Sequence, residues 1–171
     1  PGTLELPDWD SASRDAIRGL LNQLAAHQDP KAVAFGDKAE VDPVAHLIGT
    51  AAGWGANPPK AAIYVFGAPP DNSGKTAYTL TLKDVPVDGF WSVIVYNKDG
   101  FFEAPAEQAS LNSVTAKPEA DGSFVIRLGG DASQPNYLRT MEGWTYVVRL
   151  YRPRTEILDG TWKVPDLAAA N

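Results

Sequence analysis

The stretch Trp144-Thr145-Tyr146-Val147-Val148-Arg149-Leu150-Tyr151 decides the fold, because two kinds of side chain alternate along it. One set, beginning at Trp144, is entirely apolar or aromatic, whereas the other contains Thr145 and Arg149. Successive side chains of a β-strand point to opposite faces of the sheet. The stretch therefore predicts a strand whose apolar set packs into a core and whose Arg149 set lies on the opposite face.

Further strands are predicted on both sides of this sequence. The same alternation recurs over residues 78–83 and 123–128, and continuous apolar runs over 61–66 and 90–96 are typical of strands covered on both faces. Turn residues at 71–74 and 97–100 lie between these strands, as hairpin loops would. We therefore expect a mainly β fold, a jelly-roll-like antiparallel β-sandwich. Trp91 and Trp144 are predicted to be buried in its core.

The residues before this region have helical periodicity instead. Apolar residues spaced three and four apart predict an amphipathic helix over 10–27, with its apolar stripe at Ile17, Leu20, Leu21, Leu24 and Ala25. Asp42-Pro43 is a typical helix start, and Val44, Leu47, Ile48 and Ala51 would share the apolar face. We expect residues 1–55 to form a short helical segment that packs on the β domain of residues 56–171, together making one globular unit.

Composition excludes several kinds of chemistry. The 171 residues include 15 Lys and Arg against 21 Asp and Glu, which gives a net charge of −6, and contain no cysteine. Thiol nucleophiles, disulfides, thiolate zinc sites and iron–sulfur clusters are thereby absent. The acidic balance argues against nucleic-acid binding, and no apolar run reaches the roughly 20 residues that span a bilayer. No pattern indicates a metal site or a cofactor.

The chain begins at Pro1 without an initiator methionine. Removal of a leader or trimming of the chain would both give this start. A removed leader would favour a periplasmic or secreted location, although a chain without cysteine suits oxidising and reducing compartments equally.

Enzymatic candidates are few. His46 is predicted to lie opposite the apolar face of the second helix, pointing to solvent or into a cleft. A pair of carboxylates from Glu103, Glu107, Glu119 and Glu142 would be the other route to hydrolysis, and these acids all fall near predicted loops. A hydrolase of unknown substrate, using His46 or such a pair, is the alternative reading of this protein.

A binding function has more support in the sequence. Arg149 and Tyr151 share one strand face, and Tyr96, Asn112 and Tyr64 are candidates to join them around a pocket. A guanidinium beside aromatic rings can hold a carboxylate or a sugar hydroxyl. The simpler interpretation is that the aromatics fill the core and that Arg149 pairs with a carboxylate. We favour a non-enzymatic module that binds a small molecule, with carbohydrate one candidate, or that assembles with a partner protein or a second copy.

Several short phrases occur in a fixed order: Gly53-Trp54-Gly55, Gly89-Phe90-Trp91-Ser92, Ser110-Leu111-Asn112, Arg149-Leu150-Tyr151-Arg152-Pro153 and Leu158-Asp159-Gly160-Thr161-Trp162. In this combination the chain resembles the family numbered 1214 among the domains of unknown function. The resemblance implies a jelly-roll-like β domain, which in longer relatives follows a second β domain numbered 1254. It implies that a short helical segment replaces that partner domain here, and it implies no reaction and no catalytic residues.

Overall fold

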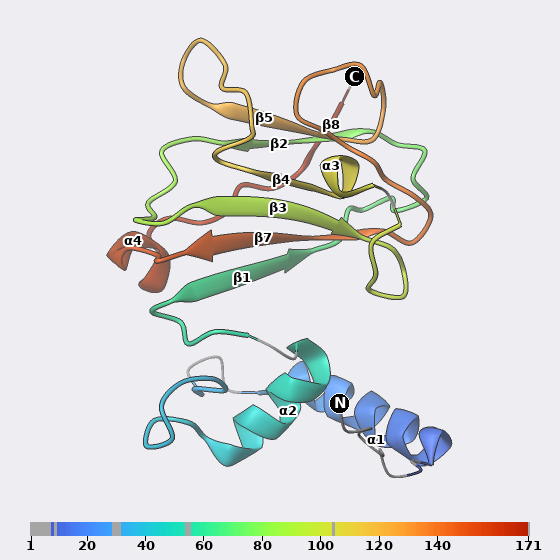
Figure 1. Ribbon diagram of the computed structural model, residues 1–171, viewed down its shortest axis with the longest axis vertical. Helices are drawn as coiled ribbons and strands as arrows, with labels where there is room; N and C mark the ends of the chain where they lie inside the picture. The colour runs from blue at the N-terminus through green and yellow to red at the C-terminus, as the bar shows by residue number, and fades with distance from the viewer. Residues whose placement is uncertain (1–7, 9, 29–31, 54–55, 104, 171) are drawn as a thin grey trace, which may run out of the picture. The chain divides into compact units, whose positions relative to one another are not determined.

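A computed structural model of the chain describes residue 8 and residues 10–28, 32–53, 56–103 and 105–170. The chain divides into two compact units, Pro1–Pro59 and Lys60–Asn171, which are described separately (Figure 1). Of the residues singled out above, Trp54 and Gly55 lie outside the described part.

The first unit contains the two predicted helices. Helix α1 spans Ser11–Ala25 and α2 spans Pro43–Gly53, and the two contact each other. An aspartate caps each start, because Asp10 accepts hydrogen bonds from the amides of Ala12 and Ser13 and Asp42 accepts them from Val44 and Ala45. Both helices are therefore confirmed, with their N-terminal caps.

The predicted apolar faces of these helices are only partly buried. Ala45 and Ile48 are buried in α2, whereas Val44 and Leu47 are exposed. Helix α2 is apolar on nearly every side, so its periodicity does not single out one face. In α1, Ile17, Leu20 and Leu24 are likewise exposed.

The second unit is made of two four-stranded sheets. Sheet A has the strand order β1-β7-β3-β4, and sheet B has the order β6-β5-β2-β8. The strands are β1 Ala62–Gly67, β2 Tyr78–Leu82, β3 Trp91–Tyr96, β4 Ser110–Asn112, β5 Phe124–Leu128, β6 Tyr137–Leu138, β7 Thr145–Tyr151 and β8 Ala168–Ala169. A mainly β fold is thereby confirmed.

The two sheets bury their inner faces in a common core. Leu80, Leu82 and Ile126 come from sheet B, and Trp91, Val93 and Val148 come from sheet A. Trp144, directly before β7, is fully buried, and Trp91 is 3% exposed. The predicted burial of both tryptophans is thus confirmed, and the period-two pattern of β7 identifies its core face correctly.

Several details differ from the expectation. Strands β5 and β6 run parallel, so the sheets are not purely antiparallel. Strand β1 is an edge strand rather than a central one, and its Phe66 is 70% exposed. The 71–74 turn is not a hairpin loop, because β1 and β2 belong to different sheets. Residues 168–169 form a further strand that pairs with β2.

Two four-residue helices also follow the helical unit: α3, Ala106–Ala109, and α4, Thr155–Leu158. In Figure 1, α4 directly follows β7. The segment after α4 brings Trp162 back against the core.

Tight turns in which an aspartate accepts hydrogen bonds close several loops of this unit. Asp121 is the strongest case, because its carboxylate accepts bonds from the Ser123 hydroxyl and the Lys83 ammonium, and also from the Ser123 amide. These donors hold the pKa of Asp121 well below its ordinary value of 3.8. The charged form of Asp121 therefore favours the folded state.

We expect this carboxylate to make the stability of the fold depend on pH in the acidic range. A folded-state pKa below the unfolded one adds stability that is complete above pH 3.8 and is lost as the pH falls through the folded value. Melting temperatures of wild type and Asp121→Asn, measured from pH 6 down to about 2, check this. The difference between the two proteins should shrink below pH 3.8, and a constant difference would contradict the assignment.

Candidate functional site

The outer face of sheet A brings together the residues predicted to form a site. Arg149 of β7 lies directly opposite Tyr64 of β1 on one side and opposite Ser92 of β3 on the other. Ser92 in turn lies opposite Asn112 of β4. Because directly opposite residues share a face, these four form one row across the sheet. Tyr151 and Tyr96 lie on the same face, since each is an even number of residues from a member of the row.

Arg149 makes few contacts for a half-buried cation. Its Nη2 donates to the hydroxyl of Tyr96, and its guanidinium carbon lies 5.9 Å from the centre of the Tyr64 ring. Its Nε is sealed from solvent without a hydrogen-bond partner, and no carboxylate among the described residues lies within ion-pair distance. A buried donor without a partner costs about 1–3 kcal/mol. The carboxylate partner considered in the simpler interpretation is therefore absent from the described residues.

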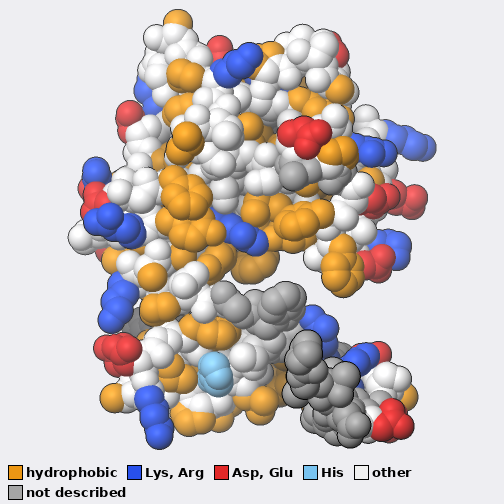
Figure 2. All heavy atoms as spheres, viewed as in Figure 1, with side chains coloured by type: hydrophobic (Ala, Val, Ile, Leu, Met, Phe, Trp, Pro, Cys, Tyr) orange, Lys and Arg blue, Asp and Glu red, His pale blue; other side chains and the backbone are white. Residues whose placement is uncertain are grey.

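Aromatic pairs lie on both sides of Arg149. Tyr151 stacks on Phe90 with ring centres 4.3 Å apart, and Tyr96 stacks on Phe102 at 5.3 Å. Phe102 is 60% exposed, and the similarly exposed Phe66 shares the Tyr64 face of β1. Figure 2 shows hydrophobic side chains gathered over the β unit with a basic side chain among them.

Phe66, Phe90 and Phe102 are not predicted as site residues from the sequence. Phe66 and Phe90 fall within continuous apolar runs, and Phe102 follows the Asn97–Gly100 turn, where no alternation indicates which face a side chain takes. An adjacent Phe101-Phe102 pair in a loop is an unusually apolar feature and would have been the available signal.

Asn112 belongs to the row by register, but its side chain makes hydrogen bonds within the turn that follows β4. Its Oδ1 accepts hydrogen bonds from the amides of Val114 at 2.9 Å and Thr115 at 3.0 Å. The side chain thus closes the turn that follows β4. Arg149, Tyr96 and Tyr151 are predicted site residues whose side chains meet on this face.

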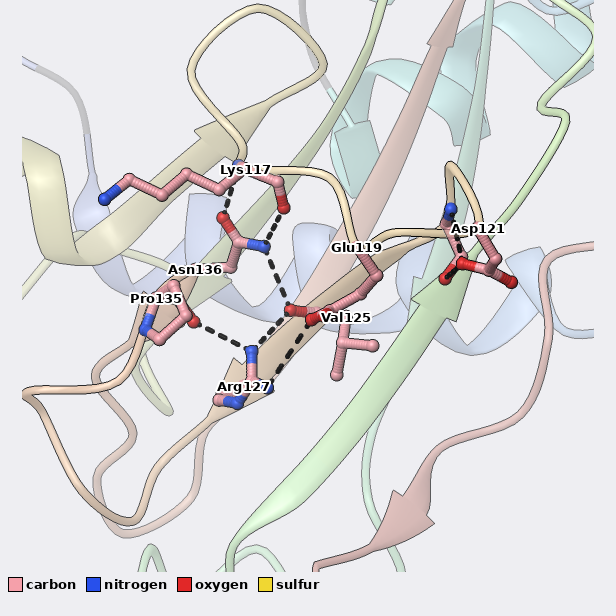
Figure 3. Close-up of polar contacts among 8 residues, drawn as sticks. Lys117, Glu119, Asp121, Val125, Arg127, Pro135 and Asn136 are labelled. Atoms are coloured by element: carbon pink, nitrogen blue, oxygen red, sulfur yellow. Dashed lines mark hydrogen bonds and ion pairs between the residues drawn. The ribbon is translucent and has the colours of Figure 1, made fainter.

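Two hollows lie elsewhere in the β unit, and none of the residues predicted for the binding face lines either one. Glu107, one of the candidate acids, lines the larger hollow. The larger, about 530 Å³, is polar and runs beside α3 and the 132–137 loop. Asn136 fixes its wall: its side chain bonds both the amide and the carbonyl of Lys117, each at 2.8 Å, and the carbonyl of Val125 at 3.2 Å (Figure 3). The Lys117 side chain extends away from this network.

His46 and Glu119, two of the candidates for hydrolysis, each have a polar partner in the structure. His46 is exposed, and its Nδ1 lies 2.8 Å from the carbonyl oxygen of Ala34. Glu119 lies 3.6 Å from Arg127. Within the described ranges, no three His, Cys, Asp or Glu side chains gather as metal ligands would. None of the helices described is long and apolar enough to cross a membrane.

Fold and surface together define a mainly β domain with an aromatic and basic sheet face. The model of the family described as "Protein of unknown function (DUF1214)" matches residues 67–155, just over half of the chain. The chain belongs to this family, as its resemblance indicated. The matched part includes Arg149, Tyr151, Tyr96 and Asn112 but not Tyr64.

A solved structure has a similar fold. The VPA0106 protein from Vibrio parahaemolyticus is similar with a TM-score of 0.68 and 20% identity over 97% of this chain, which spans 47% of that protein. The chain therefore corresponds to about half of that structure. An uncharacterized protein from Burkholderia cenocepacia has a TM-score of 0.43 and 14% identity, over 85% of this chain and 39% of its own. No curated protein matches the sequence.

Proposed function

We propose that the β unit is a non-enzymatic binding module and that the sheet A face around Arg149 receives a small molecule bearing a carboxylate. The observation that carries this proposal is a guanidinium that has no counter-charge among the described residues and lies between aromatic rings. Its Nη1 makes no hydrogen bond in the described structure and is not among the atoms sealed from solvent.

The aromatic side chains favour a ring-shaped ligand. Tyr151 with Phe90 and Tyr96 with Phe102 present two stacked pairs on either side of the cation. Aromatic faces pack against the apolar faces of sugar rings, while a guanidinium binds a carboxylate through paired donors. An acidic sugar has both features, and it is the ligand class we propose.

The test compares glucuronate-containing oligosaccharides with uncharged glucose oligosaccharides of the same length, by titration calorimetry. We expect wild type to bind the acidic series more tightly and Arg149→Met to lose roughly tenfold or more of that affinity. The melting temperature of Arg149→Met should stay close to wild type, because the substitution keeps the aliphatic bulk and removes the unpartnered Nε.

Lys83→Met is the matched control, since it removes one positive charge from an exposed residue next to sheet B. It should leave affinity for the acidic series unchanged. Equal binding of both sugar series, or no binding of the acidic one, would contradict the proposal. So would a large loss of stability in Arg149→Met, which would show that the cation is structural.

Assembly is a second candidate function, favoured by the exposed apolar side chains of the helical unit. Ile17, Leu20 and Leu24 follow one another along α1 and are all exposed. Molar mass measured by light scattering over a range of concentrations tests self-assembly, with Leu20→Glu as the disrupting variant. We also propose a jelly-roll connectivity, which the passage of successive strands β1, β2 and β3 between the two sheets supports.

A further inference from the structure

The smaller hollow is apolar and lies on the core side of sheet A. It has a volume of about 310 Å³ and is lined by Ile63 and Val65 of β1, Leu150 of β7, Ile157 of α4, and Gly160 with residues 162–164. Leu150 and Arg149 are neighbours on β7, so their side chains point to opposite faces of the sheet. The hollow is therefore separate from the proposed sugar-binding face.

This hollow is a partly open groove, because most of its lining residues are half-buried or exposed and only Leu150 is buried. A water molecule takes up about 30 Å³ in the liquid, so the hollow has room for roughly ten. Aliphatic side chains and the Trp162 indole give such water few hydrogen-bond partners, and an apolar ligand suits this lining better.

The wall formed by Trp162 is held in place by the backbone. The Trp162 amide donates to the carbonyl of Glu156 at 2.7 Å, and the Thr161 amide donates to the Asp159 carboxylate at 2.9 Å. On the other side of the hollow, β1 pairs with β7 along its whole length. The hollow is thus bounded by ordered elements on both sides.

Lys163 is the one charged residue that lines the hollow. It is exposed, and no carboxylate of the described residues lies within ion-pair distance of it. A positive charge beside an apolar hollow complements a ligand with an apolar tail and an anionic head. We propose that this hollow binds a medium-chain aliphatic carboxylate, with the tail between β1 and α4 and the carboxylate at Lys163.

The test is titration calorimetry of the full chain with hexanoate, octanoate, decanoate and dodecanoate, kept below their micellar concentrations. Each buried CH₂ group contributes about fourfold in affinity. We expect affinity to rise along the series and to level off at roughly ten carbons, when the tail fills the hollow. No saturable binding, or binding that does not depend on chain length, would overturn the proposal.

Variants locate the ligand. Val65→Phe and Ile157→Trp fill the hollow from opposite sides, and each should lower decanoate affinity at least tenfold. Lys163→Met should lower it about two- to fivefold and leave decanol binding unchanged. Lys83→Met is the control for charge, and circular dichroism confirms folding of every variant.

Two further outcomes would overturn the assignment. One is a folded Ile157→Trp protein that binds decanoate as wild type does. The other is loss of decanoate binding in Arg149→Met but not in the variants that fill the hollow, which would place the ligand on the outer face. Failure of the sugar experiment leaves this proposal unaffected, because different residues carry it.

Discussion

Replacing Trp144 with alanine is expected to lower the free energy of unfolding by about 3–5 kcal/mol. The side chain is fully buried, and its ring lies between those of Tyr78 and Tyr146, with centre distances of 6.1 Å and 6.2 Å. Alanine would leave a cavity where the two sheets meet. For a unit of this size, the melting temperature should fall by roughly 10–20 °C, as measured by calorimetry.

Trp144→Phe separates packing from hydrogen bonding. The Trp144 Nε1 is buried without a partner, so phenylalanine removes an unsatisfied donor while it keeps most of the ring. Phenylalanine should therefore lower the free energy of unfolding by clearly less than alanine does. Val114→Ala, at an 84% exposed position, is the control and should change stability by less than about 0.5 kcal/mol. A Trp144→Ala protein that melts within two degrees of wild type would contradict this account of the core.

Asn136→Ala is expected to cost roughly 2–4 kcal/mol, because it removes three hydrogen bonds at once. The side chain is buried and joins Lys117 and Val125. Its loss removes the partner of the Lys117 amide and carbonyl, whereas the Val125 carbonyl keeps its bond from Arg127. Asn136 also has a φ of 58°, a left-handed conformation that asparagine adopts more readily than alanine. Denaturant unfolding measures the loss.

Asn136→Gly is the matched comparison, since glycine adopts the positive φ freely but makes no side-chain bonds. It should recover about 1 kcal/mol relative to alanine, and the remaining loss belongs to the hydrogen bonds. Hydrogen exchange gives a local reading: the Lys117 amide should exchange faster in both variants. An unchanged Lys117 amide would show that the network of Figure 3 does not protect it.

The period-two stretches were the best guide to structure. Alternation along residues 144–151 identified the core face of β7 and placed Arg149 and Tyr151 on the other face. Cross-strand register then brought Tyr64 beside Arg149. A single strand pattern gives the face of a residue but not its neighbours, so the row across sheet A could not have been derived from the sequence.

Other features depended on long-range pairing, which leaves little local signal. Strand β1 reads as covered on both faces, yet it forms the edge of sheet A, because which strand ends a sheet is decided by all the others. The two-residue strands β6 and β8 are too short to show a period. The smaller hollow arises from residues 63–65 meeting residues 157–164, and only the folded chain reveals it.

The pairing of β1 with β7 has a consequence for how the chain folds. Ala62 pairs with Tyr151, which lies about 90 residues further along the chain. The first strand of the unit therefore pairs only when nearly the last strand is present. Closing this long loop costs conformational entropy before the β1–β7 contacts stabilise the fold. Domains with such long-range pairing fold in milliseconds to seconds. During synthesis, β1 leaves the ribosome long before its partner, and its apolar residues stay exposed until β7 follows.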